Sequence, residues 1–129
     1  MRLIIGGAFE EKVAFAAARC HLPEETFADC ASFRMEAFAG CAGIYNLHLW
    51  IRAQLAGGQS CEDILASLRQ IVSDNPSLII VTDEIGCGIV PMERSERLWR
   101  EAVGSAGCML AALAESVERV VCGCGVTVK

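Results

Sequence analysis

The sequence lacks an excess of positive charge. Its 129 residues include 11 lysines and arginines against 16 aspartates and glutamates, which gives a formal net charge of −5 at pH 7. Proteins that bind nucleic acids neutralise backbone phosphates with a basic face. Because the composition offers no such face, we expect no nucleic acid among the partners of this protein.

Long apolar runs are also missing near the start of the chain. The first acidic residues, Glu10 and Glu11, follow only a short apolar stretch. This stretch is too short for a secretory signal, or for a membrane span, which needs about 20 apolar residues. We therefore expect a cytoplasmic protein with no membrane partner. The length suits one compact domain, residues 1–129, without a linker or an internal repeat.

The eight cysteines lack the spacing of a metal site. No Cys-x-x-Cys pair occurs, and Cys122 with Cys124 makes half of a zinc site at best. Several of the cysteines lie among alanines in helical patterns, where a thiol packs as a small apolar side chain. We interpret them as reduced thiols rather than as a disulfide or zinc framework, and we predict no metal site.

Hydrophobic patterns indicate that short strands alternate with helices. Ser60 followed by Asp63 is typical of a capping box at a helix start. Residues 77–81 are too few for a helix and mostly apolar, so they predict a strand covered on both faces. The expected strands are residues 2–5, 31–35, 77–81 and two within 119–129, and the expected helices are residues 13–20, 44–55, 60–75 and 94–116. This order predicts an α/β fold with helices on both faces of the sheet.

The first strand leads into a glycine pair and a lysine, as in a phosphate-binding loop. Gly6 opens the loop and Lys12 occupies the lysine position, but Glu11 replaces the second glycine and Val13 replaces the metal-binding hydroxyl residue. A carboxylate at that place would repel phosphate by an energy on the order of several kcal/mol at a dielectric of about 20. Two interpretations stay open: a phosphate site, or a glycine turn that begins a buried helix. Lys12 either holds a phosphate or pairs with Glu10 or Glu11 as an internal phosphate mimic.

A second motif follows the strand at residues 77–81. The stretch VTDEIGCGIVP, residues 81–91, strongly resembles the adenosylcobinamide kinase/adenosylcobinamide-phosphate guanylyltransferase family, whose bifunctional enzymes act in cobalamin synthesis. The family pattern Thr-Asn-Glu-Val-Gly-x-Gly-Ile-Val-Pro is matched in register by Thr82, Glu84, Gly86, Gly88, Ile89, Val90 and Pro91. Asp83 stands where the family has asparagine. The resemblance is specific over residues 78–129, and Asn46 matches an asparagine of the family's central helix.

The resemblance implies a P-loop NTPase-like three-layer sandwich, with a mostly parallel sheet and a C-terminal antiparallel hairpin. It implies GTP or ATP with Mg as ligands, a corrinoid as a further ligand, and a homo-oligomer. Nucleotide-binding positions implied by the resemblance are Gly6, Gly7, Ala8 and Lys12, and the loop beside the site contains Asp83, Glu84, Gly86, Gly88 and Pro91. Asp83 and Glu84 either coordinate magnesium or brace the following loop.

The chain departs from this family at four places. Glu10 and Glu11 replace the Ser-Gly pair of the family loop, and Val13 replaces its final serine. The stretch with the guanylyl-accepting histidine is missing, and the family's Gly-Arg-x-Asn-Gln reads Gly-Ser-Ala-Gly-Cys at residues 104–108. We interpret residues 1–129 as a P-loop-type domain with a degenerate Walker A loop, and we assign no catalytic residue.

Three functional hypotheses follow from these observations. The first is a divergent family member that has lost guanylyl transfer, binds nucleotide weakly and serves beside cobalamin synthesis. The second is a reduced adenosylcobinamide kinase that still binds ATP or GTP. The third is an oligomeric interaction module without catalysis. We expect His48 and His21 to be packed residues rather than nucleophiles, and Arg94, Arg97 and Arg100 to form a solvated, salt-bridged helix face.

Overall fold

The computed structural model describes residues 1–32 and 40–129, and the described strands form one sheet. The strand order is β2-β3-β4-β1-β5-β6, and every neighbouring pair is parallel except β5 with β6. The strands are β1 (Arg2–Gly6), β2 (Phe27–Asp29), β3 (Gly43–Tyr45), β4 (Ile79–Asp83), β5 (Ser116–Val121) and β6 (Cys124–Thr127). The predicted C-terminal antiparallel hairpin is therefore confirmed.

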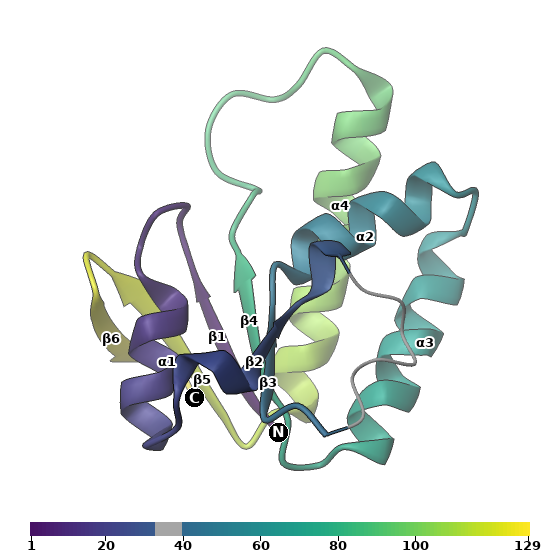
Figure 1. Ribbon diagram of the computed structural model, residues 1–129. Helices are drawn as coiled ribbons and strands as arrows, with labels where there is room; N and C mark the ends of the chain where they lie inside the picture. The colour runs from purple at the N-terminus through teal and green to yellow at the C-terminus, as the bar shows by residue number, and fades with distance from the viewer. Residues whose placement is uncertain (33–39) are drawn as a thin grey trace.

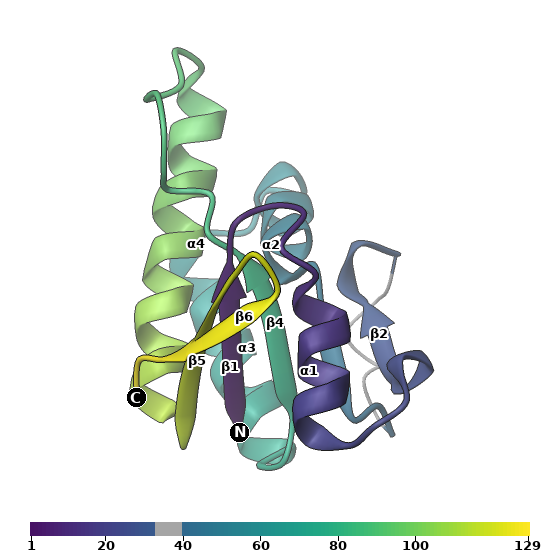
Figure 2. The same ribbon diagram turned by 90° about the vertical axis from the view of Figure 1, so that its left-hand side faces the viewer.

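Helices cover both faces of this sheet. The helix α1 (Lys12–Cys20) lies on one face, and the opposite face carries α2 (Leu47–Ala56), α3 (Cys61–Asp74) and α4 (Arg94–Leu113) (Figures 1 and 2). Two short 3-10 turns, η1 (Glu24–Thr26) and η2 (Cys30–Ser32), flank β2. The three layers and the mostly parallel sheet confirm the predicted α/β, P-loop-like fold class.

Alternating residues of the central strands divide the core into two parts. Leu3 and Ile80 face the layer of α2, α3 and α4, whereas Ile4 and Val81 face α1. The α1 layer is thin because Ala16 and Ala17 supply its inward side chains. Both faces of β1 and β4 are thus buried, which explains why these strands read as continuous apolar runs.

Several element boundaries differ from the sequence-based expectations. Ile44 belongs to β3 rather than to the following helix, because β3 pairs with β4 and needs a buried residue there. The strand expected at residues 77–81 is β4, displaced to Ile79–Asp83 by a turn in which Leu78 N donates to Asn75 O at 3.0 Å. The last helix ends at Leu113 rather than at residue 116, where β5 begins.

The remaining local predictions have mixed outcomes. The capping box is confirmed, since Ser60 Oγ accepts a hydrogen bond from Asp63 N at 3.1 Å. The strand expected at residues 31–35 is wrong at Ala31, which lies in η2, and its residues 33–35 lie outside the described residues. A strand is present slightly earlier, as β2. Within the described parts of the chain, no helix has the length and apolarity to cross a membrane.

Candidate functional site

The candidate site lies at the carboxyl ends of β1, β3 and β4, where parallel α/β sheets bind ligands. An open cleft of about 420 Å³ is bounded there by residues 8–13 and by the start of α2. Tyr45, Asn46 and Leu49 form one wall of the cleft, and Val81 and Asp83 form its floor. Of the residues that the sequence analysis assigned to nucleotide, Ala8 and Lys12 line this cleft.

The loop between β1 and α1 has a close backbone approach at Gly6 and two residues in the left-handed region. Gly6 packs so closely that an added Cβ would lie 2.6 Å from the carbonyl oxygen of Val120. Glu11 precedes the helix with φ 55°, and Phe9 has φ 61°, both in the left-handed region that favours glycine. Glu11 therefore adopts a backbone conformation that favours glycine, although its side chain lines the cleft.

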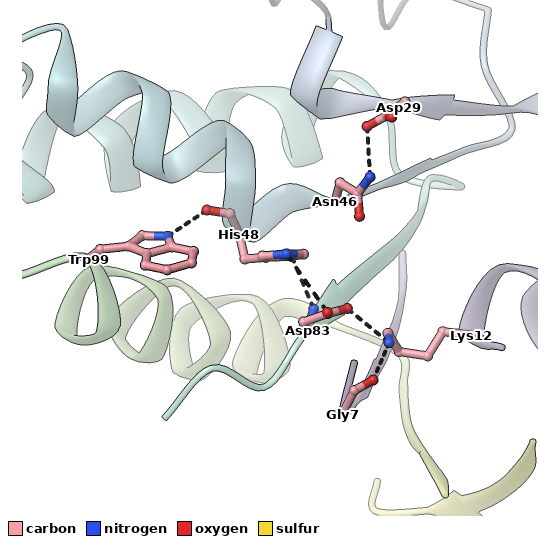
Figure 3. Close-up of polar contacts among 7 residues, drawn as sticks. All are labelled: Gly7, Lys12, Asp29, Asn46, His48, Asp83 and Trp99. Atoms are coloured by element: carbon pink, nitrogen blue, oxygen red, sulfur yellow. Dashed lines mark hydrogen bonds and ion pairs between the residues drawn. The ribbon is translucent and has the colours of Figure 1, made fainter. Parts of the chain in front are cut away.

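Lys12 is buried and already holds two partners. Its side chain is 7% exposed, and Nζ lies 2.8 Å from Asp83 Oδ1. Nζ also donates a hydrogen bond to the carbonyl oxygen of Gly7 (Figure 3). The prediction that Lys12 pairs with Glu10 or Glu11 is therefore wrong. The partner is Asp83 because the register of β1 and β4 sets Gly6 beside Asp83.

The carboxylate of Glu10 turns toward the β5–β6 hairpin. Its Oε2 accepts a hydrogen bond from the backbone amide of Cys122. Its Oε1 stays near the loop, where a Cβ added to Gly7 would lie 3.6 Å away. Glu10, Glu11 and Asp83 thus surround a cleft in which Lys12 is the lining cation.

His48 is a site residue that the sequence analysis did not connect with the motifs. Asp83 N lies 3.4 Å from His48 Nδ1, and His48 Nε2 lies 3.8 Å from Asp83 Oδ2 (Figure 3). Burial lowers the pKa of His48 below its ordinary value, and the charge of Asp83 opposes this shift. Trp99 holds the start of α2 in place by donating from Nε1 to the His48 carbonyl at 2.6 Å.

Asn46 and Asp29 form a second polar pair at the same edge of the sheet. Asn46 Nδ2 donates to Asp29 Oδ1 at 3.0 Å, and the same oxygen accepts from Ala31 N at 2.9 Å. Asn46 has φ 60° and precedes α2, so its left-handed backbone turns the chain from β3 into the helix. The sequence signal for this role was the position of Asn46 in the resemblance to the family's central helix.

The loop of residues 84–93 is braced by arginines rather than directed into the cleft. Glu84 Oε2 lies 2.7 Å from Arg119 Nε, and Glu84 N donates to Gly6 O at 2.8 Å. Arg100 donates to the carbonyls of Ile89 and Gly86, and Arg97 donates to the carbonyl of Pro91. The expectation of a salt-bridged face is therefore wrong for Arg97 and Arg100, which bind backbone oxygens.

This loop carries most of its motif residues away from the cleft. It rises from β4 beside the upper end of α4 (Figures 1 and 2). Gly88 has φ 90°, which accounts for a glycine at that turn, and neither Gly88 nor Pro91 lines the cleft. Asp83 alone of the second motif reaches both Lys12 and the cleft. In the described residues, no cluster of three or more His, Cys, Asp or Glu side chains could hold a metal ion.

Comparisons with known proteins agree with the motif at residues 82–91. The family model described as cobinamide kinase/cobinamide phosphate guanyltransferase matches residues 23–128, which is well over half of the chain. The bifunctional adenosylcobalamin biosynthesis proteins CobU of Salmonella typhimurium and of Escherichia coli are each 44% identical over 52 residues. These residues are 40% of this chain and 29% of each relative, so the matched part spans less than a third of either relative's length.

Proposed function

The chain belongs to the cobinamide kinase/cobinamide phosphate guanyltransferase family, and on this premise we propose that it is a divergent member with impaired nucleotide binding and no guanylyl transfer. Membership of this family links the chain to cobalamin biosynthesis. In this proposal the protein serves the pathway as a binding or accessory protein.

The observation that carries the proposal is the ion pair of Lys12 with Asp83. A phosphate-binding lysine must direct its ammonium group at the phosphate oxygens. Here the ammonium lies 2.8 Å from a carboxylate oxygen and also donates to the carbonyl of Gly7. A triphosphate would have to displace Asp83 from Lys12. Because Asp83 belongs to the same chain, its pairing with Lys12 costs no translational or rotational freedom, whereas binding of a nucleotide does.

The charge of the cleft opposes a triphosphate as well. Glu10, Glu11 and Asp83 line it together with Lys12. Val13, at the position of the usual serine or threonine, offers no oxygen to a magnesium ion. The residues present therefore fit a bound magnesium nucleotide poorly, and we derive no step through one.

Guanylyl transfer through a histidine also lacks support in the chain. Such a transfer needs a histidine nitrogen that reaches the phosphate in the cleft. Both histidines of the chain lie in its described part, and neither lines the cleft. His48 is 6% exposed beneath Asp83, and His21 ends α1 at the other end of that helix.

The second candidate function is a reduced cobinamide kinase. The retained strand–loop–helix path favours it, as does an acidic residue beside the loop lysine. In this alternative, Asp83 would release Lys12 and bind magnesium when a nucleotide enters. The proposed function and this alternative predict opposite outcomes in a binding experiment.

Titration calorimetry with ATP and GTP, with and without magnesium, separates the two candidates. We expect no saturable heat for the wild-type chain at nucleotide concentrations of about 1 mM, a weak limit for a nucleotide site. Micromolar binding that requires magnesium would refute the proposal and favour the kinase. Transfer of labelled phosphate to cobinamide would then test the kinase directly.

A pair of loop variants tests the stated cause. Glu11→Gly combined with Val13→Ser restores the glycine and the hydroxyl, so we expect magnesium-dependent nucleotide binding to appear. Glu101→Gln, on the exposed part of α4, removes one negative charge far along the chain and serves as the control. If the double variant stays silent while it folds normally, Glu11 and Val13 are not what blocks the cleft.

A third candidate, an oligomeric interaction module, is favoured by the loop of residues 84–93. Ile89 is 95% exposed and Met92 is 94% exposed, so this loop presents an apolar tip. We infer a homo-oligomer in which these side chains are covered. Light scattering after size exclusion should give a mass above 13.8 kDa. A strict monomer at all concentrations would exclude this candidate.

A further inference from the structure

The strand β6 forms one edge of the sheet. Among the described strands only β5 pairs with it, and it lies at the margin of the sheet in Figure 1. All four of its residues are exposed. The opposite edge strand, β2, has only three residues and is flanked by the 3-10 turns η1 and η2. The edge at β6 is therefore the longer and more open one, and an open edge is a template for pairing with another strand.

The turn before β6 sets the hydrogen-bond pattern of the hairpin. Cys122 has φ 50° and Gly123 has φ 75°, and β5 and β6 are joined by these two residues alone. Two positive φ values in a two-residue hairpin loop define a type I′ turn. The residues that flank such a turn, here Val121 and Cys124, form a hydrogen-bonded pair. From there, residues that bond to the neighbouring strand alternate with residues that do not.

This alternation directs the backbone groups of two residues of β6 away from β5. Cys124 bonds to β5, and Val128 N again donates to Val117 O at 2.8 Å. The N–H and C=O groups of the odd-numbered residues between them, Gly125 and Thr127, therefore point outward. No described strand pairs with these groups.

The features that usually protect an edge strand are missing from β6. Residues 124–128 contain no charged side chain and no proline. On one face of the strand, Val126 is 56% exposed and Val128 is 62% exposed. On the other face, Phe15 lies so close to Gly125 that an added Cβ would clash with its ring. The edge thus combines free backbone groups with uncovered apolar side chains.

Charges on the neighbouring strand do not oppose the approach of another strand. The charged residues of β5 are Glu118 and Arg119. Glu118 Oε1 lies 3.1 Å from Arg19 Nε, and Arg119 Nε lies 2.7 Å from Glu84 Oε2. Because both are paired within the chain, two copies of this edge can come together despite the net charge of −5.

We propose that β6 pairs with β6 of a second copy of this chain, antiparallel about a two-fold axis at Val126. In this register Gly125 of each copy lies opposite Thr127 of the other, so each of these residues donates one hydrogen bond and accepts one. The two Val126 side chains meet at the axis, and Val128 of one copy lies beside Cys124 of the other. A register shifted by two residues sets Gly125 or Thr127 opposite its own counterpart and forms half as many hydrogen bonds.

The symmetry closes the assembly as a dimer. The contact uses β6 of both copies and leaves no further β6 edge free. Because two short strands make a small interface, we expect a dissociation constant on the order of 0.1 mM. The contact uses neither the cleft above α1 nor the side chain of Ile89, so it holds whether or not the chain binds nucleotide.

Amide hydrogen exchange measured by NMR tests this contact on residues 1–129. The amides of Gly125 and Thr127 should exchange about fourfold more slowly at about 1 mM protein than at about 10 µM, because most molecules are then dimers. The amide of Val126, which already bonds to β5, should change little. Sedimentation velocity should show the mass rise from 13.8 kDa toward twice that value. Equal exchange of Gly125 and Thr127 at both concentrations would overturn the proposal.

Variants of β6 test the register. Thr127→Pro removes an outward N–H and puts a ring in its place, but it leaves the bonds to β5 intact, so the folded variant should dimerise at least about tenfold more weakly. Thr127→Val keeps the N–H and is the matched control, which should dimerise as the wild type does. Val126→Lys sets two ammonium groups at the axis and repeats the test if Thr127→Pro does not fold. Undiminished dimerisation of a folded Thr127→Pro or Val126→Lys variant would refute the contact.

A variant of the apolar loop tip separates this dimer from association through residues 84–93. Ile89 is 95% exposed, so Ile89→Asp removes an apolar group from that tip without disturbing the core. The amides of Gly125 and Thr127 should keep their dependence on concentration in this variant. If Ile89→Asp abolishes that dependence, association runs through the loop and the pairing of β6 is wrong.

Discussion

Removing the carboxylate of Asp83 should destabilise the protein and free Lys12. The change is Asp83→Asn, which keeps the size of the side chain and removes its charge. Lys12 is 7% exposed, so the variant leaves a buried ammonium group whose remaining hydrogen bond goes to the carbonyl oxygen of Gly7. An uncompensated buried charge is among the largest single destabilising effects in proteins.

The magnitude follows from the geometry of the pair. At 2.8 Å and an effective dielectric of about 20, the Coulomb attraction is about 6 kcal/mol. Desolvation of the two ions cancels much of this attraction, and Asp83 is 21% exposed, which reduces it further. We therefore expect Asp83→Asn to lower the free energy of unfolding by about 3 kcal/mol. Lys12→Met should cost less, because the remaining Asp83 carboxylate reaches water.

Urea unfolding of the wild type, both single variants and the double variant measures the coupling. If the pair is intact, the double variant should lose less stability than the sum of the single losses, by about 2 kcal/mol. Asp74→Asn, at the exposed end of α3, is the matched control for loss of one carboxylate and should change stability little. A coupling free energy within experimental error of zero would refute Asp83 as the main partner of Lys12.

The same variant discriminates between the two functions. If Asp83 only occupies Lys12, Asp83→Asn should make the cleft bind inorganic phosphate or ATP more tightly. If Asp83 instead serves a magnesium nucleotide, the variant should weaken magnesium-dependent binding. Calorimetry on the folded variant gives the sign of this change.

Three further predictions follow from the structure. Gly6→Ala should destabilise the protein by roughly 1–3 kcal/mol, because its Cβ would lie 2.6 Å from a backbone oxygen. The Cβ of Gly7→Ala would make only ordinary contacts, the nearest at 3.5 Å, so this variant should be nearly neutral. Thermal unfolding of both variants measures the difference. For His48, burial lowers the folded-state pKa below 6.5, so the unfolded chain binds the extra proton first as pH falls. The contribution of His48 to stability should therefore be present above the ordinary histidine pKa of about 6.5 and be lost as the pH falls below it. The charges of Asp83, Lys12 and Asp29 also act on the pKa of this ring. His48→Gln should flatten this part of the pH profile of stability, and an unchanged profile would contradict the assignment. Burial raises the pKa of Cys30 to about 12, whereas Cys87 is exposed. A thiol reagent at pH 8 should therefore label Cys87 quickly and Cys30 only when the protein unfolds. Mass spectrometry of digests measures the labelling of each cysteine.

Local patterns predicted the elements well where the physical cause is local. The capping box at Ser60 depends on residues three positions apart, and the C-terminal hairpin depends on a glycine turn between two short strands. Prediction was wrong at Ile44, where an apolar residue fits a helix face and a buried strand equally well. The deciding factor was the pairing of β3 with β4, which no local window contains.

In the candidate site too, some features could be predicted from the sequence and others could not. Gly6 and Lys12 could be identified from the spacing of the loop, and Asp83 from the second motif. That Lys12 and Asp83 contact each other could not, because 70 residues separate them and only the parallel register of β1 and β4 sets them side by side. Arg97 and Arg100 misled the prediction because charge spacing along a helix cannot show that backbone carbonyls of a loop lie within reach.

By itself the sequence determined the class of fold, the family and the acidic character of the loop between β1 and α1, since these depend on residue order and charge. Only the tertiary structure decided which carboxylate holds Lys12, where His48 lies and that β6 forms an edge of the sheet. The physical reason is that ion pairing, burial and the exposure of a sheet edge depend on distances between segments far apart in the chain. Those distances are set by how strands pair and how helices pack across the sheet.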